Sequence, residues 1–185
     1  EISECLVGSE MCIRDRVYDF NPGWRFFKSD ISGAETVNFD DRSWEVVSTP
    51  HTVELMPAEA SGCRNYQGPV WYRKHFVVPA ETKGQRVSIH FEAAMGKQIL
   101  YLNGKRIQEH IGGYLPFTLD LTTYGVQAGD SCLLAVFVDN SDDKSYPPGK
   151  RQYTLDFTYH GGIYRDVWMI AKSPISITAV SYTHL

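Results

Sequence analysis

Acidic side chains offer the clearest catalytic chemistry in this sequence, because paired carboxylates can share acid, base and nucleophile roles. Asp40 and Asp41 are adjacent. Neighbouring side chains point apart on an extended chain, so we interpret these two acids as turn residues and not as a catalytic pair. Asp156 differs, because it lies between Leu155 and Phe157, where an acid is not easily explained as a solvated surface group. Asp156 is therefore a candidate ligand-binding carboxylate, and we assign no catalytic residue.

Cysteine usage gives little support for metal or thiol chemistry. Cys132 lies in the apolar run SCLLAVFVD and is predicted to be a small core residue. Cys63, in a Gly-rich loop, is the one plausible reactive thiol, since Cys5 and Cys12 fall in an N-terminal stretch that we interpret as foreign below. The sequence has no CxxC or Cys/His ligand spacing, so we expect no zinc site.

Composition narrows the class of protein and of partner. The chain has 185 residues, of which 43% are hydrophobic, enough for one globular domain with a core. The formal net charge of -4 and the scattered Lys and Arg argue against a nucleic-acid partner. No apolar run approaches the roughly 20 residues that span a bilayer, so we expect no membrane partner.

Both ends of the sequence differ from the rest. Residues 1–16, EISECLVGSEMCIRDR, have neither a basic leader nor a sustained apolar stretch, and so do not resemble a secretory signal. The strings CLVGSEMCIRDR and VSYTHL resemble translated adapter DNA. We therefore interpret residues 1–16 and 180–185 as foreign and residues 17–179 as one domain, and we assign no localisation.

The elements between these ends are predicted to be strands. QRVSIHFEA places Val87, Ile89 and Phe91 on one face, as in a half-buried strand. Asn103 and Gly104, between two alternating runs, are typical of a type I′ hairpin turn. Many strands at short spacing, with few or no helices, predict an all-β sandwich or jelly roll. Trp44, behind an Asp-rich turn, is expected to anchor the core.

One connection is too long for a hairpin. From Asp139 to Gly162 the sequence is polar, turn-rich and studded with aromatic residues, and a loop of this length is usually functional or disordered. The aromatic residues argue against disorder, so we expect an ordered loop that faces a ligand or another domain. Gly161 and Gly162 end it by letting the chain turn sharply, or another segment approach closely, before a strand predicted over residues 163–170.

Five ordered motifs together resemble the amino-terminal jelly-roll domain of family-two glycoside hydrolases, the group of β-galactosidases, β-glucuronidases and β-mannosidases. They are GWRFF (23–27), NFDDRSWEVVSTPHT (38–52), GPVWYRKHFVVP (68–79), LNGKRI with HIGGYLPFTLDLT (102–107 and 110–122) and GGIYRDVWM (161–169). The resemblance implies a galactose-binding-domain-like fold and a parent enzyme that hydrolyses β-linked sugars with retention. Retention needs two carboxylates about 5–5.5 Å apart; in this family both lie in a later (β/α)₈ barrel of about 250 residues, for which this chain has no room.

The resemblance also implies site residues. In large β-galactosidases an aspartate of this loop contacts substrate and a bound cation, and Asp156 stands at the matching position, six residues before Gly162. Asp156 is thus the candidate for both substrate and metal binding, with a cation expected only in the full-length parent and no cofactor in this fragment. Asn65 and Tyr66 lie where a second loop of the family approaches substrate. For these two, we favour the alternative of an exposed turn.

The predicted function is therefore an accessory domain that completes the rim of a β-glycosidase active site and docks on the following domains of the same parent chain, with carbohydrate as substrate. Two alternatives stay open. A stand-alone carbohydrate-binding module would need an aromatic platform on one exposed face, and a structural spacer would need no ligand site.

Overall fold

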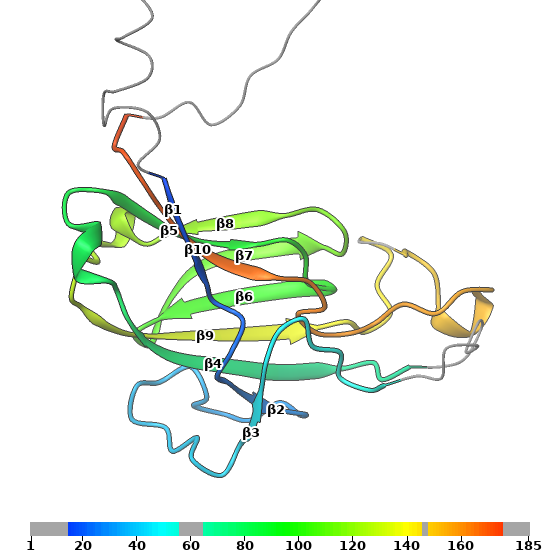
Figure 1. Cartoon of the computed structure of the whole chain (residues 1–185). Coiled ribbons are helices and arrows are strands. Elements are labelled where there is room, and N and C mark those ends of the chain that lie inside the picture. Colours follow the sequence, from blue (N-terminus) through cyan, green and yellow to red (C-terminus); the bar gives the residue numbers. More distant parts are fainter. Residues whose placement is uncertain (1–14, 56–64, 146–147, 176–185) are drawn as a thin grey trace, which may run out of the picture.

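The computed structural model of the chain describes residues 15–55, 65–145 and 148–175. These residues form two antiparallel sheets packed face to face (Figure 1). None of them lies in an α-helix, and their helical segments are the short 3₁₀ turns η1 (Ala80–Thr82), η2 (Thr122–Tyr124) and η3 (Gln152–Thr154). The prediction of an all-β jelly-roll sandwich is confirmed. No helix in the described ranges is long and apolar enough to cross a membrane.

The two sheets have different sizes. The four-stranded sheet consists, in order across it, of β1 (Arg16–Asp19), β10 (Val167–Lys172), β5 (Arg86–Phe91) and β8 (Phe117–Asp120). The six-stranded sheet consists of β3 (Glu45–Val47), β2 (Trp24–Phe27), β4 (Pro69–Val77), β9 (Ser131–Asp139), β6 (Gly96–Leu102) and β7 (Lys105–Gly112). The first and last strands of the described chain are neighbours, and Arg16 pairs with Ala171 in their ladder.

The predicted hairpin turn joins β6 to β7. Asn103 and Gly104 have φ angles of 50° and 82°, the positive values that a type I′ turn needs at both central residues. The Asn103 side chain also stabilises the turn, because its Oδ1 accepts a hydrogen bond of 2.8 Å from the Leu133 amide of β9. The turn is thereby held against the next strand, and the hairpin prediction is confirmed.

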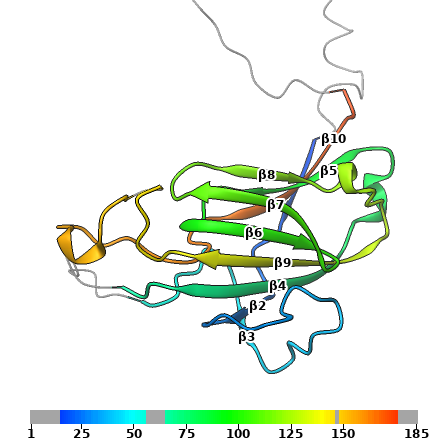
Figure 2. The ribbon, with the colours of Figure 1, turned by 180° about the vertical axis from the view of Figure 1, so that it is seen from behind.

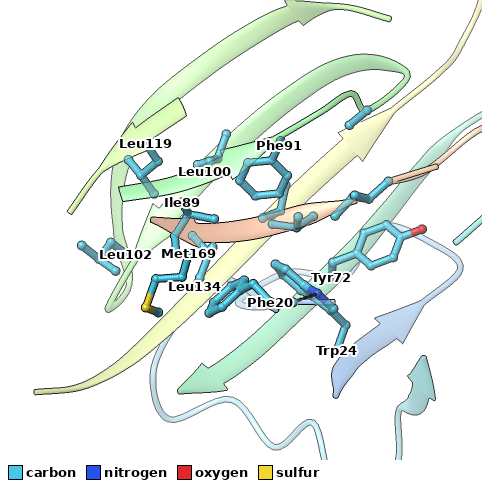
Figure 3. Close-up of a cluster of buried hydrophobic side chains, with 14 of the residues drawn as sticks. Phe20, Trp24, Tyr72, Ile89, Phe91, Leu100, Leu102, Leu119, Leu134 and Met169 are labelled. Atoms are coloured by element: carbon cyan, nitrogen blue, oxygen red, sulfur yellow. Dashed lines mark hydrogen bonds between the residues drawn. The ribbon is translucent and has the colours of Figure 1, made fainter. Parts of the chain in front are cut away.

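The main core lies between the two sheets (Figure 3). Alternation places Val87, Ile89 and Phe91 of β5 inside, each at most 4% exposed, as predicted. Large side chains of both sheets meet them, among them Trp24 and Leu134, which are fully buried. Burial of apolar area on this scale is the main favourable contribution to folding.

A second apolar cluster covers the outer face of the six-stranded sheet. The segment of residues 28–44, which we call the strap, packs Ala34 and Trp44 against Trp71 of β4 and Ala135 of β9. Trp44 is 6% exposed, so its predicted role as a core anchor is confirmed. The six-stranded sheet therefore has apolar packing on both of its faces.

A buried ion pair fixes the strap to the sheet. Arg73 of β4 is fully buried, and its Nε donates a 2.7 Å hydrogen bond to the carboxylate of Asp41. Its guanidinium also donates to backbone carbonyls of the strap, including that of Thr36 at 2.9 Å. Burial acts to raise the pKa of Asp41, but hydrogen bonds from Arg73 and His75 lower it further than burial raises it. Asp41 closes a turn, as predicted, and is in addition a buried ion-pair partner.

Candidate functional site

The long connection between β9 and β10 lies at one end of the sandwich, beside the segments that lead into β4 (Figure 2). The two glycines that end it are tightly enclosed. A Cβ on Gly161 would lie 2.4 Å from Asn140 Nδ2, and one on Gly162 would lie 2.4 Å from Tyr72 Oη. Gly162 also has a φ of +94°. Both reasons given for a double glycine, a sharp turn and a close approach, are therefore confirmed.

The strand after these glycines begins later than predicted. Residues 163–166 are not in a ladder, and β10 starts at Val167. Ile163 is buried and Arg165 is exposed, so the two do not share a face as a strand would require. Instead Asp166 accepts a 2.9 Å hydrogen bond from the Asn21 side chain, which fixes the entry to the strand.

Buried amide side chains of Asn140, Gln152 and Asn65, which we call the frame, connect the segments at this end of the sandwich. Asn140, 3% exposed, accepts a 3.0 Å hydrogen bond from the Gly68 amide and donates one of 2.8 Å to the Tyr66 carbonyl. Gln152 in η3 accepts a 2.9 Å bond from the Asn65 amide. The long loop is thus joined to the segment before β4 by side chain to backbone bonds, which fits the expectation of an ordered loop.

Asn65 belongs to this frame. It is 7% exposed, and its Nδ2 donates a 2.9 Å hydrogen bond to the Tyr159 carbonyl. Its Oδ1 accepts from the Tyr66 amide at 2.7 Å. The expectation of an exposed turn is therefore wrong for Asn65, because both polar atoms of its side-chain amide are hydrogen-bonded to the backbone of the loops.

Tyr66 is half-buried. Its hydroxyl donates a 3.0 Å hydrogen bond to the Pro69 carbonyl, and the Lys28 ammonium lies 4.8 Å from the centre of its ring. Burial raises the pKa of the Tyr66 hydroxyl. The phenol therefore stays neutral over the physiological range, where it can donate a hydrogen bond but not act as a base.

Asp156 is exposed, between half-buried Leu155 and exposed Phe157, so the expectation that its apolar neighbours keep it from being a solvated surface group is wrong. The structure brings it into the same loop system as Asn65, because Asn65 bonds Gln152 and Tyr159 on either side of Asp156 in the sequence. The three predicted site residues thus lie in two connected segments. An exposed carboxylate held on a braced loop can accept hydrogen bonds from hydroxyl groups or bind a hard cation.

The described residues do not contain a cluster of acidic, histidine or cysteine side chains that could bind a cation. Within residues 15–55, 65–145 and 148–175 no three His, Cys, Asp or Glu side chains gather as metal ligands. A cation at Asp156 would therefore need ligands of another kind, such as carbonyl oxygens or water, or side chains from outside these ranges. Cys63, the thiol singled out from the sequence, also lies outside the described residues.

Sequence reasoning missed several residues of this end. Asp142 accepts hydrogen bonds from the Gln67 side chain at 2.7 Å and from the Gln152 amide at 3.1 Å. His51 Nδ1 lies 2.8 Å from the Tyr72 hydroxyl, and burial lowers the pKa of this histidine. A polar residue directly after an apolar strand, as Asn140 is, was the signal that could have located the frame.

Exposed apolar side chains surround the same loops. They are Leu55 before β4, Tyr114 and Leu115 between β7 and β8, and Tyr153 and Phe157 in the long loop. Tyr164 connects two of these groups, because its hydroxyl donates to the Gly113 carbonyl. Grouped exposed apolar residues are a common mark of an interaction surface.

A family model described as "Glycosyl hydrolases family 2, sugar binding domain" matches residues 15–174. The chain belongs to this family. The resemblance drawn from the five motifs is therefore confirmed, as is the expectation of a domain of the kind found in β-glycosidases.

Relatives and solved structures agree. A "Beta-galactosidase" of Thermoanaerobacter pseudethanolicus is 39% identical over 153 residues, which is 83% of this chain and 20% of that protein. A "Beta-glucuronidase" of Formosa agariphila is 34% identical over 99% of this chain and 19% of its own length. The crystal structure of a β-glucuronidase from Bacteroides uniformis superposes with a TM-score of 0.73 at 32% identity, over 85% of this chain and 18% of that one.

The chain therefore spans about a fifth of the length of the curated relatives that it matches. A calcium-binding mutant of Bacteroides uniformis β-glucuronidase 2 is also among the similar structures, with a TM-score of 0.73.

Proposed function

We propose that this chain is the accessory amino-terminal domain of a β-glycosidase, a retaining enzyme whose two catalytic carboxylates lie in a (β/α)₈ barrel outside the chain. The observation that carries the proposal is the match itself: the sugar-binding family covers residues 15–174, while relatives called β-galactosidase and β-glucuronidase are about five times as long as the part that matches this chain. The domain completes the rim of the active site and docks on the domains that follow it.

The end of the sandwich that carries the long loop is the proposed contact with the barrel. Its exposed apolar residues, such as Leu115 and Phe157, would lose contact with water on docking, which favours association. The buried amides of Asn140 and Gln152 keep the loop in one conformation before docking, which reduces the conformational entropy lost on association.

Within this end we propose separate roles for the three site residues. Asp156 accepts hydrogen bonds from a sugar hydroxyl, or contributes one oxygen ligand to a cation completed by the parent protein. Tyr66 presents a partly exposed ring to the substrate side. Asn65 acts as a positioning residue, because its amide is already bonded to Tyr159 and Tyr66.

The first experiment measures hydrolysis by the 185-residue chain on nitrophenyl β-galactoside, β-glucuronide and β-mannoside. We expect no turnover. Hydrolysis that survives repurification would overturn the assignment of the catalytic carboxylates to another domain. Sequencing the adjoining reading frame gives a second test, and a reading frame without a barrel would favour a stand-alone binding module or a spacer.

The sharper experiment uses the full-length parent protein. Losing a charged hydrogen bond costs about 1.5–3 kcal/mol, so Asp156→Asn should lower kcat/KM by roughly ten- to a hundred-fold. Asp143→Asn is the matched control, because Asp143 is an exposed acid of the same loop whose carboxylate accepts bonds from Ser145. Equal kinetics in the two variants would reduce Asp156 to an ordinary loop acid.

A further inference from the structure

The outer face of the four-stranded sheet is hollowed into a trough of about 510 Å³, within the range of roughly 300–1,000 Å³ seen for small-molecule sites. Its lining comes from three adjacent strands. Arg86, Ser88 and His90 of β5 form the centre, Thr118 and Asp120 of β8 form one side, and Ile170 and Lys172 of β10 form the other. The trough lies on a face of the sheet, away from the loop end that carries Asp156.

Strand alternation explains why polar groups line it. The core-facing residues of β5 and β10 are apolar and buried, so their neighbours in sequence point outward. The ladders then place outward residues in rows across the three strands. In one row His90 lies between Trp168 and Thr118. In the next row Ser88 lies between Ile170 and Asp120. Hydrogen-bonding side chains therefore meet an apolar side chain, Ile170, on the β10 side of the trough.

The charges of the trough balance. Arg86 donates to the Asp120 carboxylate in an ion pair, and Glu92, which accepts the hydrogen bond of Trp168, is a second acid beside the trough. These two acids match the two cations of the lining, Arg86 and Lys172, so no net charge is left to select an anion. His90 adds a further hydrogen-bonding group, with its Nδ1 2.9 Å from Thr118 Oγ1 and its second nitrogen not used in that bond.

An indole extends the row at one end. Trp168 is partly exposed on the same outer face, opposite His90 in the ladder. Its Nε1 donates a 3.0 Å hydrogen bond to Glu92, which fixes the orientation of the ring. A fixed aromatic ring beside planar polar groups matches a ligand that has both apolar C–H faces and many hydroxyl groups.

We propose that this trough is a second carbohydrate site, which binds a neutral oligosaccharide. The site is independent of Asp156 and of the barrel, and it would hold the domain on a glycan while hydrolysis takes place elsewhere. Neutral sugars fit better than uronic acids because Arg86 is already paired with Asp120 and because the acids of the trough and its surroundings, Asp120 and Glu92, match its two cations.

The test is a titration of the 185-residue chain, followed by two-dimensional NMR, with a neutral β-linked galactotetraose or cellotetraose and with a tetragalacturonate as the charged counterpart. We expect the neutral sugars to shift amide signals of β5, β8 and β10 with millimolar affinity. Ser88→Trp, which fills the trough from its centre, should weaken that affinity by roughly tenfold or more, and His90→Ala should also weaken it.

The matched control is Ile111→Trp, which adds the same bulk at an exposed position of β7 in the other sheet and should leave the affinity unchanged. Thermal unfolding of each variant checks that the fold is kept. Absence of shifts at the solubility limit of both neutral sugars, or wild-type affinity in Ser88→Trp, would overturn the site, and tighter binding of the tetragalacturonate would overturn the neutral ligand. These outcomes are separate from turnover by the parent, so either proposal can fail alone.

Discussion

Replacing Gly162 by alanine tests whether the glycine pair is required by backbone angle, by space, or by both. Gly162 has a φ of +94°, and its new Cβ would lie 2.4 Å from Tyr72 Oη and 3.1 Å from the His51 carbonyl oxygen. The Tyr72 hydroxyl has little freedom to move, because the side chain is fully buried and lies 2.8 Å from His51 Nδ1. Relief of the contact would therefore displace part of the core.

The loss of unfolding free energy in Gly162→Ala has two contributions. Alanine substitutions at two other glycines measure these contributions separately. A positive φ costs a residue with a Cβ about 1–2 kcal/mol, and overpacking of a core costs about 1–3 kcal/mol, so Gly162→Ala should lose about 2–5 kcal/mol. Gly84 has a φ of +79° with nothing within 4 Å of its Cβ position, so Gly84→Ala should lose only the first part. Gly161, which has no positive φ but lies 2.4 Å from Asn140 Nδ2 at its Cβ position, should lose only the second.

The assay is equilibrium urea unfolding of the four proteins at neutral pH, with thermal unfolding beside it. For a chain of this size about 1 kcal/mol corresponds to about 2–4 °C in Tm, so Gly162→Ala should melt about 4–20 °C lower. A loss in Gly162→Ala no larger than that in Gly84→Ala would refute the steric part of the reasoning. A Gly161→Ala variant as stable as the wild type would refute the close approach at Asn140.

Three further predictions concern stability and the loop. Arg73→Met removes the buried cation that pairs with Asp41 and leaves its carboxylate only the contact with His75, so it should lose about 3–5 kcal/mol in urea unfolding, and a loss below about 1 kcal/mol would contradict the role of the pair. Burial lowers the pKa of His110 below its ordinary 6.5, so the unfolded chain takes up the proton more readily. Unfolding free energy should therefore fall as the pH drops below about 6.5, and the fall should be smaller in His110→Phe. Asn65→Ala removes the bond to Tyr159 and should speed amide hydrogen exchange in residues 152–160 while leaving exchange in β9 unchanged; equal exchange would show that Asn65 does not brace the loop.

Local patterns were enough to predict most of the fold. The alternation in QRVSIHFEA and the Asn103–Gly104 pair depend only on strand and turn geometry, and both are confirmed in β5 and in the β6–β7 hairpin. The strand expected from Ile163 failed at its start for a physical reason. Residues 163–166 are held by loop contacts such as that of Asp166 with Asn21, and alternation of residue types does not encode such contacts.

Partners distant in the sequence could not be predicted from pattern. Arg73 and Asp41 lie 32 residues apart and meet only because the strap crosses the sheet. The burial of Lys74 was likewise not predicted; its ammonium donates to the Phe20 carbonyl at 2.8 Å, and burial lowers its pKa to about 8. At the candidate site, the role of Asp156 stays a prediction from its position in the sequence, while the buried frame around Asn65 depends on contacts between distant segments that the sequence pattern does not encode.

The first described strand pairs with the last, so this pairing can form only late in the synthesis of the chain. Val17 and Ile170 face each other in the ladder, yet they leave the ribosome about 150 residues apart, which at about 5–20 residues per second is about 8–30 s. During that interval β1 lacks the strand that it pairs with among the described residues, because β10 separates it from β5. The strands of the six-stranded sheet are all made before β10, so that sheet can assemble while the other is still incomplete. The polar trough, which takes one wall from β10, is therefore among the last parts of the domain to form on a nascent chain.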